Sequence, residues 1–174
     1  MIRIGFLFPS SDYLHDPFRG DPHTHFQILT AIDHVMSDKV DLKLIDLRGI
    51  GREWAPYHIP ECDIYLQSVY TLDVEEQTEI VHRIRENYPQ AIHIAGGPHV
   101  IEFPEESLQV FDSLILGDGE ELIIQAIRDI EKQCLKQVYQ QDCPVDVNAY
   151  PVPSRRFLTK AMIARKDMVT LKHK

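Results

Sequence analysis

Short apolar runs alternate along this chain with longer segments in which apolar residues recur every three or four positions. The longer segments have the period of a helix with one buried face, as in Phe26, Leu29, Ile32 and Met36. The short runs are apolar enough to be buried on both faces, which is typical of strands in a parallel sheet covered by helices. We therefore predict an α/β fold with five parallel strands and helices on both faces. The predicted strands cover residues 2–8, 40–47, 62–69, 91–95 and 111–116.

The pattern changes after residue 137. Residues 138–174 contain several prolines, have no clear period and carry mostly positive charge. We predict a domain over 1–137 and an extended arm over 138–174 that packs poorly on it. Because the chain stops without a terminating element, we also expect a longer natural protein. Within the domain, the segment between Glu102 and Val110 is the weakest predicted helix, and Asp73 with Glu76 is a predicted capping pair.

Composition narrows the class of protein. The chain has 174 residues, enough for one domain with a core of its own. Its 18 Lys and Arg against 27 Asp and Glu leave a net charge of −9, which argues against a nucleic acid partner. Three irregularly spaced cysteines do not make a disulfide framework, as expected in a reducing cytosol. No apolar run reaches the roughly eighteen residues of a membrane span, and no signal peptide begins the chain, so we predict a soluble, cytoplasmic domain.

Two predicted strands end in glycine-rich motifs, GGPH at residues 96–99 and GDGE at residues 117–120. The carboxyl ends of parallel strands share one edge of the sheet, where ligands bind in open α/β folds. Glycines there either make tight turns or let a ligand approach the backbone, and the motifs leave both interpretations open. Neither motif is a dinucleotide fingerprint or a P-loop, since GxGxxG after the first strand and GxxxxGK[ST] are missing.

Polar side chains follow the predicted strands at the same edge. Hydroxyl-bearing residues come after the third strand, although a polar turn is the commoner reason for them. Glu120 opens a predicted helix, where a carboxylate also favours the helix dipole. Histidines at 15, 23, 25 and 99 are candidate metal ligands, but most loop histidines are solvated. The candidate binding residues are Ser68, Tyr70, Thr71, Gly96, Gly97, Pro98, His99, Gly117, Asp118, Gly119 and Glu120.

Four segments occur in the order and spacing of a known family: "DIYLQSVYT", "RIRENYPQAIHIAGGPHVIEFPEE", "FDSLILGDGEELI" and "YPVPSRRFL". Together they resemble the cobalamin-binding domain that precedes the catalytic barrel in cobalamin-dependent radical SAM enzymes. In that family the fourth strand ends in GGPH, the fifth ends in a GEGE motif, and a P-x-P-x-R stretch leads into the barrel. The resemblance covers about residues 1–160 and is strongest from Asp63 to Leu122.

The resemblance implies a flavodoxin-like sheet with a corrinoid across the strand ends and its nucleotide tail running into the sheet edge. It implies that Gly96, Gly97 and Gly117 lack side chains because the tail needs that space. The hydroxyls after the third strand would then hydrogen-bond the tail or the ring amides. On this basis a Gly97→Leu substitution should displace the ligand while the fold survives.

The sequence departs from the family pattern in two motifs. The GEGE motif reads GDGE, a mild change at Asp118. The DxHxxG signature of the wider cobalamin-binding superfamily is broken, since its nearest match, which begins at Asp21, has Phe26 where the glycine should stand. His23 would be the cobalt ligand of that signature, and because the signature is broken we do not expect it to act as one.

The resemblance implies a cobalamin-binding module of a radical SAM enzyme, or a free-standing cobalamin carrier. The chain lacks the CxxxCxxC motif of the iron–sulfur cluster. Cluster, S-adenosylmethionine and the methyl transfer or related radical chemistry would therefore belong to a barrel in cis or in trans, and we predict no catalytic residue here. One alternative is a regulatory domain that binds a nucleotide-like ligand at the same edge. Another is an interaction module whose pocket has decayed.

Overall fold

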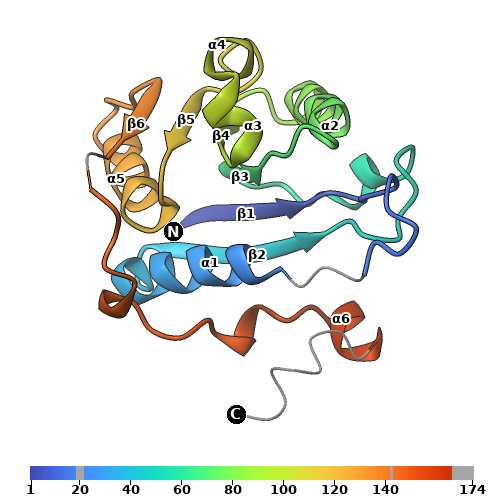
Figure 1. Ribbon diagram of the computed structural model, residues 1–174, viewed down its shortest axis with the longest axis horizontal. Helices are drawn as coiled ribbons and strands as arrows, with labels where there is room; N and C mark the ends of the chain where they lie inside the picture. The colour runs from blue at the N-terminus through green and yellow to red at the C-terminus, as the bar shows by residue number, and fades with distance from the viewer. Residues whose placement is uncertain (19–21, 142, 166–174) are drawn as a thin grey trace.

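Six parallel strands form one sheet in the computed structural model, which describes residues 1–18, 22–141 and 143–165. The strand order is β2-β1-β3-β4-β5-β6, so the direction of winding reverses between β1 and β3. Helices α1 and α5 cover one face of the sheet, and α2 and α3 cover the other (Figure 1). The strands are β1 (Ile2–Phe8), β2 (Val40–Asp46), β3 (Ile64–Ser68), β4 (Ile92–Gly96), β5 (Ser113–Leu116) and β6 (Val138–Gln140). The α-helices are α1 (His23–Met36), α2 (Val74–Asn87), α3 (Pro98–Glu102), α4 (Pro104–Ser107), α5 (Gly119–Glu131) and α6 (Lys160–Arg165), and the 3-10 helices are η1 (Ala55–His58), η2 (Val147–Ala149) and η3 (Arg155–Phe157).

The predicted α/β fold with a parallel sheet is confirmed, but the predicted number of strands is wrong. The five predicted strands are β1 to β5, and β4 lies inside the sheet between β3 and β5. The sixth strand, β6, pairs with β5 and lies at the edge. It has three residues, of which only Tyr139 is buried. A strand this short carries too little alternation to be recognised from sequence.

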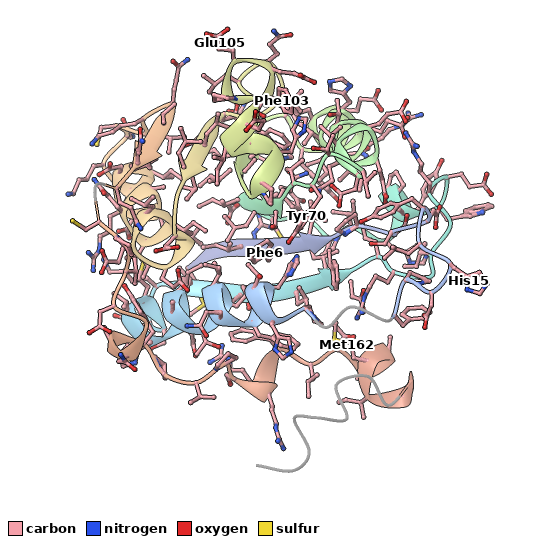
Figure 2. The ribbon with its side chains drawn as sticks, in the orientation of Figure 1. Phe6, His15, Tyr70, Phe103, Glu105 and Met162 are labelled. Atoms are coloured by element: carbon pink, nitrogen blue, oxygen red, sulfur yellow. The ribbon has the colours of Figure 1, made fainter. Side chains whose placement is uncertain are left out.

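The segment after β6 also differs from the prediction of a poorly packed arm. Phe157 and Met162 are 5% and 0% exposed and belong to the same core cluster as α1. Figure 2 shows Met162 directed from α6 toward the rest of the domain. Arg156 forms an ion pair of 2.7 Å with Asp33 on α1. The apolar and acidic positions of α1 therefore hold this segment, while residues 166–174 lie outside the described part of the chain.

Two expectations about local structure need correction. The weak helix predicted between Glu102 and Val110 is shorter than expected: it corresponds to α4, Pro104–Ser107, and it follows the short helix α3, which also begins at a proline. Asp73 and Glu76 do not form a capping box at the start of α2. Asp73 instead accepts hydrogen bonds from Tyr70 N and Gln77 Nε2, and Glu76 accepts from a backbone amide of the loop after β1.

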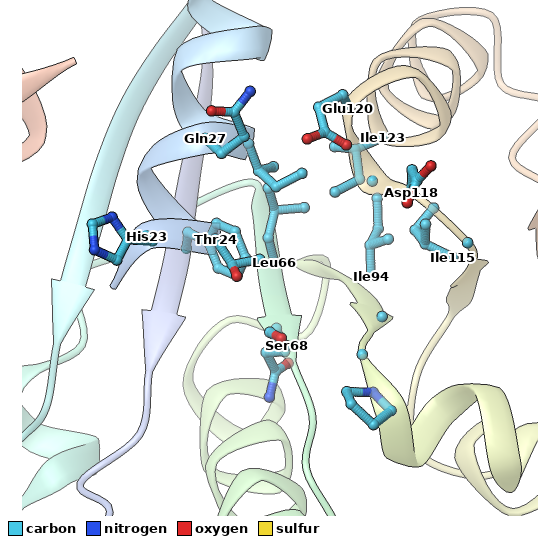
Figure 3. Close-up of a pocket in the computed structure, with 18 of the residues that line it drawn as sticks. His23, Thr24, Gln27, Leu66, Ser68, Ile94, Ile115, Asp118, Glu120 and Ile123 are labelled. Carbon is cyan, nitrogen blue, oxygen red and sulfur yellow. The ribbon is translucent and has the colours of Figure 1, made fainter. Parts of the chain in front are cut away.

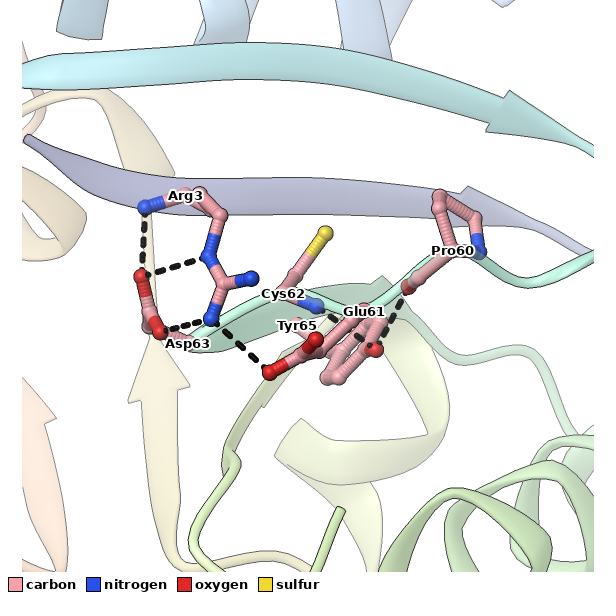
Figure 4. Close-up of polar contacts among 6 residues, drawn as sticks. All are labelled: Arg3, Pro60, Glu61, Cys62, Asp63 and Tyr65. Carbon is pink, nitrogen blue, oxygen red and sulfur yellow. Dashed lines mark hydrogen bonds and ion pairs between the residues drawn. The ribbon is translucent and has the colours of Figure 1, made fainter. Parts of the chain in front are cut away.

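The amino ends of β1 and β3 are joined by an ion pair (Figure 4). Asp63 accepts hydrogen bonds from Arg3 N and Arg3 Nη2 at 2.8 and 2.6 Å, and the guanidinium lowers the pKa of this carboxyl. The Tyr65 hydroxyl donates to Pro60 O and accepts from Cys62 N. The contacts between Arg3 and Asp63 hold the two strands together at the end opposite the glycine motifs. None of the helices in the described ranges is both long and apolar enough to cross a membrane.

Candidate functional site

A cavity of about 500 Å³ lies at the carboxyl ends of β3, β4 and β5, between the sheet and helices α1 and α5 (Figure 3). It is next to the point where the winding of the sheet reverses, between β1 and β3. Open parallel sheets bind ligands at such a point because two neighbouring connections leave in opposite directions and open a crevice. The position of the cavity is therefore that of a ligand site.

The exposed part of the cavity lining is polar, and the buried part is apolar. Its polar lining side chains, which we call the rim, belong to exposed or half-exposed residues: His23, Thr24, Gln27, Ser68, Tyr70, Asp118 and Glu120. Its buried apolar side chains, which we call the inner end, are at most 7% exposed: Phe6, Ile28, Leu66, Ile94, Ile115 and Ile123. The cavity thus suits an amphipathic ligand with its apolar part inside.

Gln67 is the one buried polar residue among the described residues of this lining, and its amide is engaged on the other face of the sheet. Its Nε2 donates to Gln77 Oε1 at 3.3 Å, and its Oε1 accepts from His93 Nδ1 at 3.3 Å. Neighbouring residues of a strand point to opposite faces, so Leu66 faces the cavity while Gln67 faces α2. The amide of Gln67 is therefore not a binding group of the inner end.

Gly97 is required by the backbone itself. Its φ is +101°, and a Cβ there would lie 2.8 Å from both Val69 N and Val69 O. Real Cβ atoms do not approach backbone atoms so closely, and the conformation is unfavourable for any L side chain. Against the expectation that the fold survives Gly97→Leu, these overlaps predict that a bulky residue there destabilises the fold itself.

Gly96 and Gly119 are less constrained by neighbouring backbone atoms than Gly97. A Cβ at Gly96 would meet Ile115 Cβ at 3.4 Å, an ordinary contact, and Gly96 lies on the same face of β4 as Ile94 of the inner end. A Cβ at Gly119 would lie 2.7 Å from Ile28 Cδ1, the end of a side chain that can turn away. Gly96 is thus the position from which an added side chain would enter the cavity with the least effect on the backbone.

Nine of the eleven predicted site residues border the cavity. The two that do not are Thr71 and His99. They bond each other, Thr71 Oγ1 to His99 Nδ1, at 3.2 Å, and the His99 ring lies 5.0 Å from the Phe103 ring. His99 is buried within α3, so it supports the loop after β3 from outside the cavity. The nine are Ser68, Tyr70, Gly96, Gly97, Pro98, Gly117, Asp118, Gly119 and Glu120.

Helix α1 contributes a wall that the sequence did not reveal as part of a site. His23, Thr24, Gln27 and Ile28 border the cavity from its first turns. The helical period predicts which side of α1 is buried. It does not predict that the first turns of the helix line a cavity instead of packing against other side chains. His23 lies at the rim, and Asp21 of the broken signature lies outside the described residues. Among the described residues, no three His, Cys, Asp or Glu side chains group as a metal site.

The segment after β6 borders the same cavity. Gln141 Nε2 and Val145 N both donate to Asp118 Oδ2 at 3.0 Å. Gln141 also packs against Gly117, where a Cβ would lie 3.2 Å from Gln141 Cγ, and Pro153 lines the cavity. The prolines and polar residues of this segment have no period and gave no sign of this role.

A buried carboxyl supports the loop that carries Tyr70. Asp73 is 4% exposed, and burial raises its pKa to about 6. Its Oδ1 accepts from Tyr70 N at 2.9 Å and from Gln77 Nε2 at 2.9 Å. Gln77 Nε2 also donates to the carbonyl oxygen of Ser68 at 3.0 Å. Two rim residues, Ser68 and Tyr70, are therefore held in place from the α2 face of the sheet.

The fold is shared with a known enzyme, although the sequence gives no match. No protein-family model and no curated protein matches this chain. Among solved structures, the chain is similar to the cobalamin-dependent S-adenosylmethionine radical enzyme OxsB with aqua-cobalamin bound, with a TM-score of 0.62 and 16% sequence identity. The similarity covers 78% of this chain and 19% of OxsB, so the chain spans less than a fifth of that enzyme's length. At this identity the comparison concerns the fold: the chain has an α/β fold similar to part of a cobalamin-dependent radical enzyme.

Proposed function

We propose that this chain is a flavodoxin-like cobalamin-binding module, with the corrin ring at the strand ends and the nucleotide tail in the cavity. The observation that carries the proposal is the cavity itself, which lies beside the two glycine motifs and continues between the sheet and helices α1 and α5. The family that the sequence resembles places its corrinoid at this edge, and OxsB, which shares the fold, was solved with aqua-cobalamin bound.

The residues present fit such a ligand. A corrin ring carries amide side chains that need hydrogen-bond partners, and the rim offers the carboxylates of Asp118 and Glu120 and the hydroxyl groups of Ser68 and Tyr70. The base at the end of the tail is flat and largely apolar, as is the inner end of the cavity. Bound cobalt would carry a methyl group or tune a radical step, and the reaction itself would need a radical SAM barrel in cis or in trans. We expect the module to work in the cytoplasm.

The second candidate is a nucleotide-like ligand at the same edge. Its phosphates would meet the amino end of α5 at Gly119, a favourable position for an anion. Among the described residues that line the cavity, however, there is no Lys or Arg, while Asp118 and Glu120 both border it. A diphosphate or triphosphate would therefore lack cationic partners. Cobalamin, with a single phosphodiester in its tail, suits this charge distribution better.

A titration of the purified chain with aqua-cobalamin, followed by the visible corrinoid bands, tests the proposal. Gly96→Leu should fill the cavity and weaken binding by about ten- to a hundredfold, the effect of overpacking a tight site. Gly51→Leu is the matched control, because Gly51 is exposed and a Cβ there meets nothing closer than Trp54 Cδ1 at 3.7 Å.

The outcomes separate the two candidate ligands. Binding by the wild type and by Gly51→Leu, with loss in Gly96→Leu, supports a corrinoid in the cavity. No spectral change with the wild type, or equal affinity in Gly96→Leu, contradicts it. Competition of ADP against aqua-cobalamin in the same assay addresses the nucleotide, which we expect to displace nothing at millimolar concentration.

A further inference from the structure

The inner end of the cavity is made only of hydrocarbon side chains. Phe6, Leu66, Ile94 and Ile115 come from the sheet, and Ile28 and Ile123 face them from α1 and α5. Each of these six residues is at most 7% exposed. A group that enters this space leaves water on all sides and meets carbon atoms.

The polar groups nearest to the inner end do not change this environment. The amide of Gln67 is bonded to Gln77 and His93 on the other face of the sheet. Gln27 and Glu120 face each other from α1 and α5 (Figure 3), and both are half-exposed. Because water reaches both side chains, a hydrogen bond to either would replace one to water and add little affinity.

We propose that this cavity selects among corrinoids by the base of the nucleotide tail, and that it prefers an apolar benzimidazole base to a purine. The inference depends on the proposed cobalamin binding, and it adds the class of corrinoid. An adenine base carries an amino group and ring nitrogens that hydrogen-bond to water, and the inner end supplies no partner for them. Each polar group left unpaired weakens binding, so we expect the adenine-containing corrinoid to bind about ten- to a hundredfold more weakly.

Three corrinoids that share one ring test this selectivity on the wild-type chain. They are aqua-cobalamin, its analogue with adenine as the tail base, and cobinamide, which lacks the nucleotide tail. When the tail lies in the cavity, its base is detached from cobalt. The free energy of this detachment differs between aqua-cobalamin and the adenine analogue. Each measured affinity is therefore corrected by the base-detachment equilibrium of the free corrinoid, obtained from an acid titration.

The expected order is cobalamin first, with the adenine analogue and cobinamide both weaker. Equal affinities for cobalamin and the adenine analogue, or a preference for the adenine analogue, would overturn the selectivity while cobalamin binding stands. Equal affinities for cobalamin and cobinamide would mean that the tail lies outside the cavity, which also overturns it. If none of the three binds, the proposed function fails, and the selectivity fails with it.

A substitution in the inner end provides a second measurement. Ile123→Gln would add an amide to the wall of the cavity and give a purine a hydrogen-bond partner. We expect it to reduce the preference for cobalamin over the adenine analogue to about threefold or less. Ile163→Gln makes the same change at a residue on α6 that is 62% exposed, and it should leave the preference unchanged. An unchanged preference in a folded Ile123→Gln would count against the inner end as its source.

Discussion

The two faces of strand β3 look onto different surroundings. On one face, Leu66 borders the cavity together with hydrocarbon side chains of α1 and α5. On the other, Gln67 joins a buried network of hydrogen bonds with Gln77, His93 and Asp73. The cavity face leaves room and offers no polar partner inside, whereas the α2 face is filled and positions the loop after the strand. Adjacent residues of one strand therefore divide two tasks, the lining of the cavity and the support of the loop after the strand.

Gly96 and Gly97 show the same division, since Gly96 borders the cavity and Gly97 is constrained by the backbone. Of the substitutions considered, Gly97→Leu should have the largest effect on stability. Gly97→Leu should lower the free energy of unfolding by about 2–5 kcal/mol, because it combines a left-handed backbone with overlap against Val69. Gly96→Leu should lower ligand affinity and change stability far less. Urea unfolding monitored by circular dichroism measures both variants. A Gly97→Leu protein as stable as the wild type would show that the backbone relaxes and that the division between the two glycines is wrong.

His93 makes the α2 face sensitive to acid. Burial lowers its pKa from an ordinary 6.5 to about 4, and its Nε2 has no partner among the described residues. Because the pKa is lower in the folded state, the contribution of neutral His93 to the free energy of unfolding is fully present above pH 6.5 and is lost as the pH falls toward 4. We expect protonation of His93 to lower the free energy of unfolding by roughly 2–3 kcal/mol.

The variant His93→Asn isolates that effect, since its amide can still donate to Gln67. Unfolding by urea at pH 7, 5.5 and 4.5 should show a steeper decline for the wild type than for the variant. His25, which is also buried and has a pKa lowered to about 4, is present in both proteins and cancels in the comparison. Parallel declines in the two proteins would contradict the assignment.

Asp73 should have a smaller effect of the opposite sign. Its pKa is raised to about 6, so the charged carboxylate that is present at pH 7 destabilises the folded state, and the penalty disappears as the pH falls below 6. Asp73→Asn retains an oxygen that accepts from Tyr70 N. We expect this variant to be more stable than the wild type by roughly 1–2 kcal/mol at pH 7, with the difference gone near pH 4. A difference that does not change with pH would exclude titration of Asp73 as its cause.

The sequence alone determined the layers of the fold and pointed to the edge of the sheet where the cavity lies. Apolar runs such as those around Ile4, Tyr65 and Ile94 have only one solution when they alternate with one-sided helices, a parallel sheet between helical layers, and the structure confirms it. The glycine motifs after two strands marked the edge at which the cavity lies, because parallel strands bring their carboxyl ends together. The resemblance to cobalamin-binding domains used the same motifs.

Only the tertiary structure decided which residues share the cavity and which support it. The sequence could not distinguish Gly96 from Gly97, because the difference is the distance to Val69, which directly follows the neighbouring strand β3. It could not place His99 beside Thr71 and outside the cavity, nor Ile28 of α1 within it. Periodicity reports whether a side chain is buried. Whether it is buried against atoms or against an open space depends on how helices and strands distant in sequence are spaced, and that is set by the packing of the whole domain.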